Sequence, residues 1–109
     1  YAYENVDVKR YPRYFNTPNQ EGLSKKVAML EHCEATLIFG SGMAAITTAL
    51  LSFLETGDHL VIQQSIYGGA YNFMVEELPK YGIEFDFTDG FSEDDFRTKV
   101  KKNTKVIYI

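Results

Sequence analysis

The 109-residue sequence lacks the features that mark several common classes of protein. Its only cysteine, Cys33, cannot form an internal disulfide, so we expect a reducing compartment, namely the cytoplasm. We find no apolar run near the roughly 20 residues that span a bilayer, and the polar, aromatic N-terminus is unlike a signal peptide. The formal net charge of −4 disfavours nucleic acid or an anionic membrane as the main partner.

Two further absences concern metal ions and the ends of the chain. The two histidines, His32 and His59, have no second ligand at metal-binding spacing, so no metal site is predicted. The sequence has no initiator methionine, and it stops in residues 106–109, a pattern typical of a buried strand. We therefore expect a chain that is truncated at both ends.

What is present is a globular composition with alternating secondary-structure signals. Hydrophobic residues make up 45% of the sequence and charged residues 24%, which disfavours a disordered chain. Residues 1–19, punctuated by proline and asparagine, read as an ordered loop or arm. The patterns predict helices over about residues 20–32, 42–54 and 70–81, a short helix from Ser92, and strands over residues 35–39, 59–63, 83–87 and 104–109. Pro79 is expected to kink or end the third helix.

The order of these elements indicates the fold class. Strands that alternate with helices imply right-handed βαβ units. The sequence therefore predicts an α/β fold whose four strands form a mostly parallel sheet. In such a sheet, ligands bind beyond the carboxyl ends of the strands.

The segment Gly40-Ser41-Gly42 falls at such a strand end, immediately before a helix. The free N–H groups and the dipole of a helix start favour an anion such as phosphate, and Ser41 can either cap the helix or donate its hydroxyl to the anion. The alternative is a tight turn with a serine cap. The segment is not a dinucleotide fingerprint, because the G-x-G-x-x-G spacing fails at Ala45, and it lacks the Gly-Lys-Ser/Thr of a P-loop.

A second candidate, Tyr67-Gly68-Gly69, follows the next predicted strand and so falls at the same edge of the sheet. The tyrosine ring can lie over a planar heterocycle, and the paired glycines let the following helix start close to it. The alternative is a tyrosine that packs over the end of the sheet.

The third candidate, Tyr11-Pro12-Arg13, lies in the arm. An arginine fork beside a tyrosine hydroxyl is well shaped for phosphate. An arm that precedes the domain can reach a neighbouring subunit as easily as its own sheet. The alternative is an exposed arginine, with Tyr11, Tyr14 and Phe15 packing on a surface.

Taken together, the segments resemble the Cys/Met-metabolism family of pyridoxal-phosphate (PLP) enzymes, which includes cystathionine γ-synthase, cystathionine β- and γ-lyases, methionine γ-lyase and O-acetylhomoserine sulfhydrylase. The resemblance runs from about residue 3 to residue 109. The family's Y-S-R-x-x-N-P-T arm, L-E-G-A helix end, S-G-M-A-A-I signature, G-D turn and Y-G-G element correspond to residues 11–18, 30–35, 41–46, 57–58 and 67–69. The arm departs from the motif at Pro12 and in the order Thr17-Pro18, and Cys33 stands about where the family has glycine.

The resemblance implies a fold and an activity. The chain would be part of the large PLP-binding domain of a fold-type I, aspartate aminotransferase-like enzyme, with residues 1–19 as an arm that contacts a neighbouring subunit and residues 20–109 as a partial, C-terminally truncated domain. Its parent would carry out β- or γ-elimination or replacement at C–S bonds of sulfur-containing amino acids, as a homodimer or homotetramer.

The resemblance also implies roles for single residues. Ser41, Gly42 and Met43 would bind the phosphate of PLP, with Gly42 and Met43 using their backbone N–H groups. Tyr67 would stack on the pyridine ring and take part in proton transfer. Tyr11 and Arg13 would grip the phosphate held by the adjacent subunit.

The residues that the chemistry requires are missing from the sequence. The family's Schiff-base Lys, in an S-x-T-K motif, and the Asp on the pyridine nitrogen lie well downstream of Y-G-G. Lys105 follows a threonine but falls at the start of the last strand, at the opposite edge of the sheet, and Asp86 and Asp89 come too early. Two alternatives stay open: a non-catalytic truncated fragment, which fits an inactive 109-residue chain, and an unrelated Rossmann-like phosphate- or nucleotide-binding domain.

Overall fold

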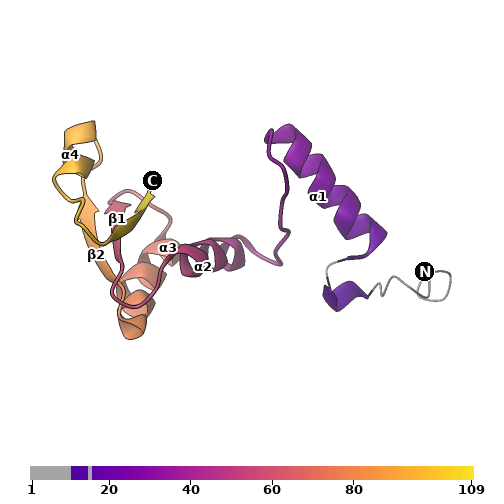
Figure 1. Cartoon of the computed structure of the whole chain (residues 1–109), viewed down its shortest axis with the longest axis horizontal. Coiled ribbons are helices and arrows are strands. Elements are labelled where there is room, and N and C mark those ends of the chain that lie inside the picture. Colours follow the sequence, from indigo (N-terminus) through magenta and orange to yellow (C-terminus); the bar gives the residue numbers. More distant parts are fainter. Residues whose placement is uncertain (1–10, 15) are drawn as a thin grey trace. The chain divides into compact units, whose positions relative to one another are not determined.

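The computed structural model describes residues 11–14 and 16–109, and the chain divides into two compact units between Gly40 and Ser41 (Figure 1). Of the predicted arm, residues 1–10 and Phe15 lie outside the described residues. The predicted division at residue 19, between an arm and a cofactor domain, stays a prediction. Within the described residues, no helix combines the length and apolar character needed to cross a membrane.

The first unit is built on α1 (Pro18–Leu30), which follows a 3-10 turn, η1 (Pro12–Tyr14). The helix starts two residues earlier than predicted, because the Gln20 side chain accepts the Thr17 amide (3.2 Å) and proline is favoured at the first helical position. It ends before His32, whose φ of 54° is left-handed and so cannot continue the helix.

The prediction of a buried strand over residues 35–39 is wrong. This apolar segment pairs with no strand in the described part of the first unit, and the side chain of Leu37 is 78% exposed. The Thr36 carbonyl accepts a hydrogen bond from the Ser24 hydroxyl of α1 instead of from a strand. An apolar run becomes a strand only where a neighbouring strand completes its hydrogen bonds, so its composition alone was not sufficient.

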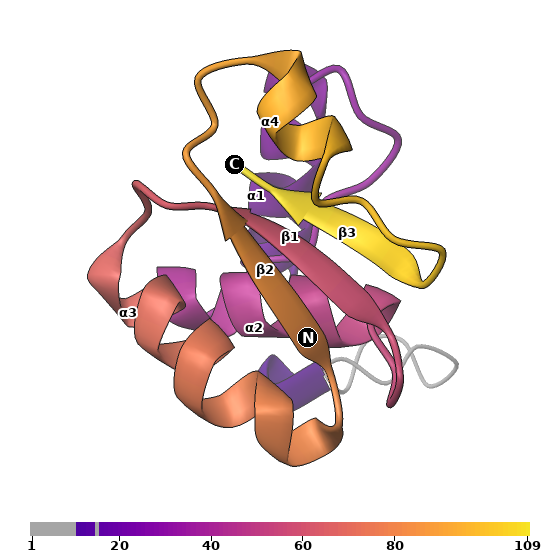
Figure 2. The same cartoon turned by 90° about the vertical axis from the view of Figure 1, so that its left-hand side faces the viewer.

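Residues 41–109 form the second unit, a sheet of three parallel strands with its helices (Figure 2). The predicted α/β class and parallel pairing are confirmed, with three strands in place of four. The strand order is β2 (Glu84–Thr88), β1 (His59–Gln63), β3 (Thr104–Tyr108). The bounds of β1 match the prediction, whereas β2 starts one residue later.

The helices of the second unit follow the predicted order. α2 (Gly42–Phe53) comes first; α3 (Gly68–Asn72) continues into a π-helical turn, η2 (Phe73–Glu77), and a 3-10 turn, η3 (Leu78–Tyr81). The helix ends as predicted near Pro79, because Gly82 turns the chain out with a φ of 72°. The short α4 (Glu93–Arg97) is capped by Ser92, whose hydroxyl accepts the Asp95 amide (3.3 Å).

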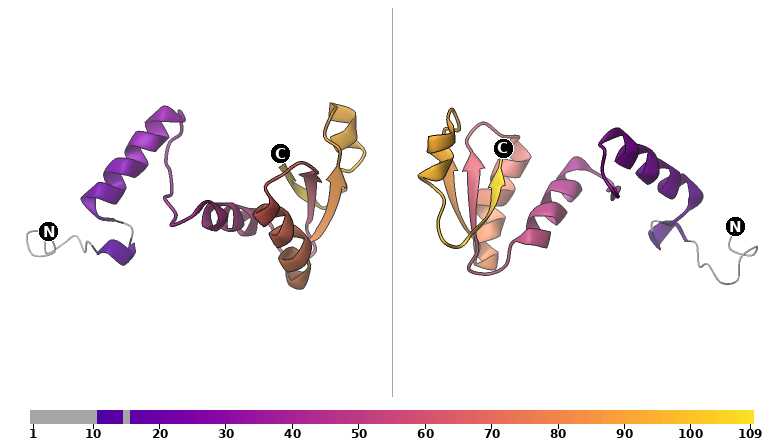
Figure 3. Two further views of the ribbon diagram at one scale, coloured as in Figure 1. Left: turned by 180° about the vertical axis from the view of Figure 1, so that it is seen from behind. Right: turned by 45° about the horizontal axis from the view of Figure 1, so that its top comes forward.

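The core lies between the central strand and the two longer helical segments. Leu60 and Ile62 of β1 are fully buried on the face that α2 and α3 cover, as the views in Figure 3 show for the ribbons. The side chains that pack against this face from the helical segments, and from Leu54 directly after α2, are apolar: Leu50, Leu54, Ala70, Met74 and Leu78. Burying these side chains fixes both helices on one face of the sheet.

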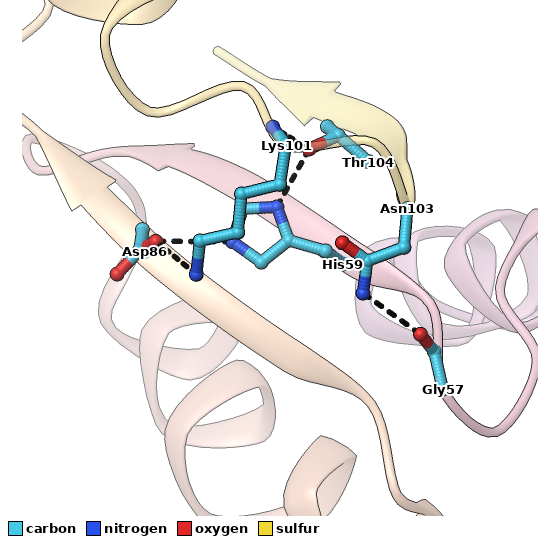
Figure 4. Close-up of polar contacts among 6 residues, drawn as sticks. All are labelled: Gly57, His59, Asp86, Lys101, Asn103 and Thr104. Carbon is cyan, nitrogen blue, oxygen red and sulfur yellow. Dashed lines mark hydrogen bonds and ion pairs between the residues drawn. The ribbon is translucent and has the colours of Figure 1, made fainter.

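The other face of the sheet carries a polar network around His59, the first residue of β1 (Figure 4). The imidazole is fully buried. Its Nδ1 lies 2.8 Å from Thr104 Oγ1 of β3, and its Nε2 lies 3.2 Å from Asp86 Oδ2 of β2. Since a carboxylate only accepts, Nε2 carries the proton. One side chain therefore joins all three strands.

Lys101 completes the network from the turn before β3. Its ammonium lies 2.7 Å from Asp86 Oδ2, and its backbone N–H donates to Thr104 Oγ1 (2.7 Å). The hydrogen bond and charge of Lys101 hold the pKa of Asp86 below its usual range, with a smaller contribution from His59 and against the effect of burial. Because the pKa is lowered on folding, the stabilisation is complete above about pH 4 and is lost as pH falls through the lowered value.

We predict that Asp86→Ala lowers the free energy of unfolding by about 1–3 kcal/mol at pH 7, because it leaves a buried imidazole N–H without its acceptor. Urea denaturation measures the loss. The gap between wild type and variant should narrow as pH falls from about 4, the usual pKa of the carboxyl in the unfolded chain, through the lowered pKa of Asp86 in the folded protein. The control is Glu84→Ala, an exposed position in the same strand that makes no hydrogen bond to the imidazole, which should change stability by less than about 0.5 kcal/mol. Equal losses for both variants would contradict the role of the network.

Candidate functional site

The start of α2 leaves two backbone donors available. Ser41 caps this helix: its hydroxyl accepts the Ala44 amide (3.1 Å), and its carbonyl accepts the Ala45 amide (3.2 Å). Helix geometry gives the first N–H groups no intrahelical acceptor, so the amides of Gly42 and Met43 remain free to bind a ligand. Gly42 is exposed and Met43 is half-buried. The helix dipole adds partial positive charge at the same place.

Of the two roles that the sequence left open for the Ser41 hydroxyl, the structure confirms the helix cap, and donation to an anion stays a prediction. Its oxygen uses one lone pair to cap the helix, which confirms the cap. Its own O–H proton is not needed for that bond and can be donated outward. Three donors, two backbone amides and one hydroxyl, are thus gathered at one helix start, which suits an anion with several oxygens.

Tyr67 lies beside this helix start. It precedes α3, and its ring is 68% exposed. The ring edge and the Met43 thioether both rest on the backbone of Gly69, since a Cβ placed there would lie 2.7 Å from Tyr67 Cε1 and 3.2 Å from Met43 Sδ. The second unit therefore brings together four of the predicted site residues: Ser41, Gly42, Met43 and Tyr67. An anion group at α2 and a flat ring against Tyr67 can belong to one ligand.

Tyr11 and Arg13 belong to the first unit. The η1 turn is closed by the Tyr14 amide, which donates to the Tyr11 carbonyl (2.8 Å), and the Asn16 side chain accepts the Tyr11 amide (2.9 Å). The rings of Tyr11 and Tyr14 lie 5.7 Å apart between centroids. Tyr11 and Arg13 are both exposed, so their side chains are accessible to another molecule.

The polar groups at the opposite edge of the sheet do not join this site. Lys105 is exposed near the start of β3, and β3 is parallel to β1, whereas Tyr67 follows the end of β1. This agrees with its rejection as the lysine that bonds the cofactor. Sequence reasoning missed the His59 network, although one signal was available: a histidine that opens an otherwise apolar strand.

Comparison with known proteins shows the family of the chain. Residues 2–109 match the family described as Cys/Met metabolism PLP-dependent enzyme. The chain is 40% identical over 108 residues to the cystathionine beta-lyase of Bacillus subtilis and 38% identical over 99 residues to the L-methionine gamma-lyase of Fusobacterium nucleatum subsp. polymorphum. These alignments cover 99% and 91% of this chain, and 27% and 25% of the relatives.

A solved structure shows the same likeness in three dimensions. The crystal structure of metB from Corynebacterium glutamicum matches all of this chain with a TM-score of 0.90 and 29% identity, over 29% of its own length. The chain thus spans about a quarter of the length of the relatives that it matches. Because the family match extends over nearly every residue, the chain belongs to the Cys/Met metabolism family of PLP-dependent enzymes.

Proposed function

We propose that this chain supplies the phosphate grip (Ser41, Gly42 and Met43) and one ring contact (Tyr67) of a PLP-dependent enzyme that makes or breaks C–S bonds in sulfur amino acids. The observation that carries the proposal is the pair of free amides at the start of α2 beside the exposed Tyr67 ring. PLP has a phosphate and a flat pyridine ring, the two groups that such a site fits. The names of the matched relatives support the substrate class.

The residues of the second unit would act mainly in binding and orientation. Gly42 and Met43 donate N–H bonds to phosphate oxygens, the Ser41 hydroxyl adds a third, and the helix dipole favours the dianion. Tyr67 would stack on the pyridine ring, and its hydroxyl would take part in proton transfer. The bound cofactor supplies an electron sink for charge that develops at the substrate's α-carbon.

The arm would act in a neighbouring subunit. Tyr11 and Arg13 are exposed on the η1 turn, and a guanidinium with a phenol hydroxyl suits a phosphate that already has two backbone donors. Each site would then be complete only in a homodimer or a tetramer of dimers.

The single cysteine, Cys33, is exposed and free, which suits the reducing cytoplasm.

The first prediction from this proposal concerns the cofactor. The full-length protein should retain PLP through dialysis, with visible absorbance, and should bind pyridoxal, which lacks the phosphate, about 100-fold or more weakly, because two or three charge-assisted hydrogen bonds are lost. With PLP it should release a thiol, ammonia and a 2-oxo acid from cystathionine or methionine, or exchange their sulfur substituent for that of another thiol. Equal affinity for PLP and pyridoxal, or no turnover of any sulfur amino acid, would refute the proposal.

Ser41 allows the cap to be separated from the phosphate contact. Ser41→Ala should lower the free energy of unfolding by about 0.5–2 kcal/mol, whereas Ser41→Gly should lower it by only a few tenths, because glycine is tolerated as an N-cap. Both variants lack the hydroxyl, so both should bind PLP about tenfold more weakly. Urea denaturation of the cofactor-free protein and PLP titration give the two readouts. PLP affinity that follows stability across the variants would show that Ser41 only caps the helix.

Mixed dimers test whether the arm acts across subunits. Subunits with Arg13→Ala and subunits with Tyr67→Ala should each be nearly inactive alone. In a mixed dimer, one site combines the intact Tyr67 of the first subunit with the intact Arg13 of the second, so co-expression should restore activity. Activity that stays at the level of the separate variants would place Arg13 in the site of its own subunit.

A further inference from the structure

Gly69 carries no side chain, although its backbone does not require a glycine. It is the second residue of α3, and its φ is not in the left-handed region, in contrast to Gly57, Gly82 and Gly90. Alanine is more favourable than glycine inside a helix. A glycine at this position therefore needs another reason.

The reason is the close approach of two side chains. A Cβ on Gly69 would lie 2.7 Å from Tyr67 Cε1, 3.4 Å from Tyr67 Cδ1 and 3.2 Å from Met43 Sδ. The first distance is shorter than any carbon–carbon contact that packing tolerates. The preceding Gly68 is in the same first turn, yet a Cβ there would meet nothing within 4 Å. The restriction is specific to position 69.

Gly69 thus lies close to one residue of the phosphate grip and to the residue that makes the ring contact. Met43 offers one of the two free amides of α2, and Tyr67 offers the ring. The Tyr67 ring is mostly exposed, so few other contacts hold it in place. The bare backbone of Gly69 is the surface on which the ring edge rests, and it sets how near the ring lies to the start of α2.

We propose that Gly69 is a positioning residue, which places the Tyr67 ring at the distance from α2 that a ligand spanning the phosphate grip and the ring requires. This inference rests on the proposed function. A methyl group at position 69 pushes an exposed side chain, which can rotate at little cost, so the fold survives while the ring moves.

The test compares Gly69→Ala with Gly68→Ala in the full-length protein. Both variants add a methyl group in the first turn of α3, so thermal unfolding of the cofactor-free protein should occur at or above the wild-type temperature in both. Only Gly69→Ala should weaken PLP binding, by about threefold to tenfold, because the ring contact is displaced. It should also change the visible circular dichroism of the bound cofactor, which a purely structural role would leave unaltered.

A Tyr67→Ala background tests whether Gly69 acts through the Tyr67 ring. With the ring removed, adding Gly69→Ala should have no further effect on PLP affinity or on the circular dichroism. Gly69→Ala behaving like Gly68→Ala, or acting equally with and without the Tyr67 ring, would overturn the positioning role while wild-type PLP binding stands. Absence of PLP binding by the wild-type protein would instead overturn the proposed function and this inference with it.

Discussion

The buried imidazole of His59 is the constraint on which the alignment of the sheet depends. A fully buried polar ring must satisfy its nitrogen atoms, and here it does so with Thr104 on one side and Asp86 on the other. Both partners are on different strands, so satisfying one side chain sets the register of β2 and β3 against β1. A shift of either strand would leave a buried polar group unpaired, which is far more costly than losing an exposed hydrogen bond.

The polar network and the candidate site lie at opposite ends of the strands. The network joins the first residues of β1 and β3, whereas Tyr67 follows the end of β1. Stability at one end leaves the other end free to expose the amides of Gly42 and Met43, which have no intrahelical acceptor among the described residues. Because α2 and α3 bury apolar side chains on the same face of the sheet, their first turns meet, and Met43 comes to lie beside Tyr67.

The sequence predicted best the features whose causes are local. The caps at Ser41 and Ser92 and the end of the third helix near Pro79 depend on neighbouring residues, and all were confirmed. The segment 35–39 failed because a strand depends on a partner that composition does not reveal. In the His59 network, the imidazole contacts two side chains that lie 27 and 45 positions further along the chain, Asp86 and Thr104. The contact of Gly69 depends on the orientation of the Tyr67 ring. Neither feature produces a periodic pattern in the sequence from which it could be predicted.

The same distinction explains why a chain with a quarter of its relatives' length can carry so much of a proposed binding site. An anion site at a helix start is made from backbone amides, a cap and small residues, all within a few positions of one another. A motif such as residues 41–46 can therefore indicate such a site without the rest of the fold. Covalent and acid–base chemistry needs side chains that converge from distant strands, so a short chain can contain the residues that bind a phosphate without those that carry out a reaction. Tyr67 is between these cases: the motif indicates the residue, but the close approach of its ring to Gly69 is visible only in the structure.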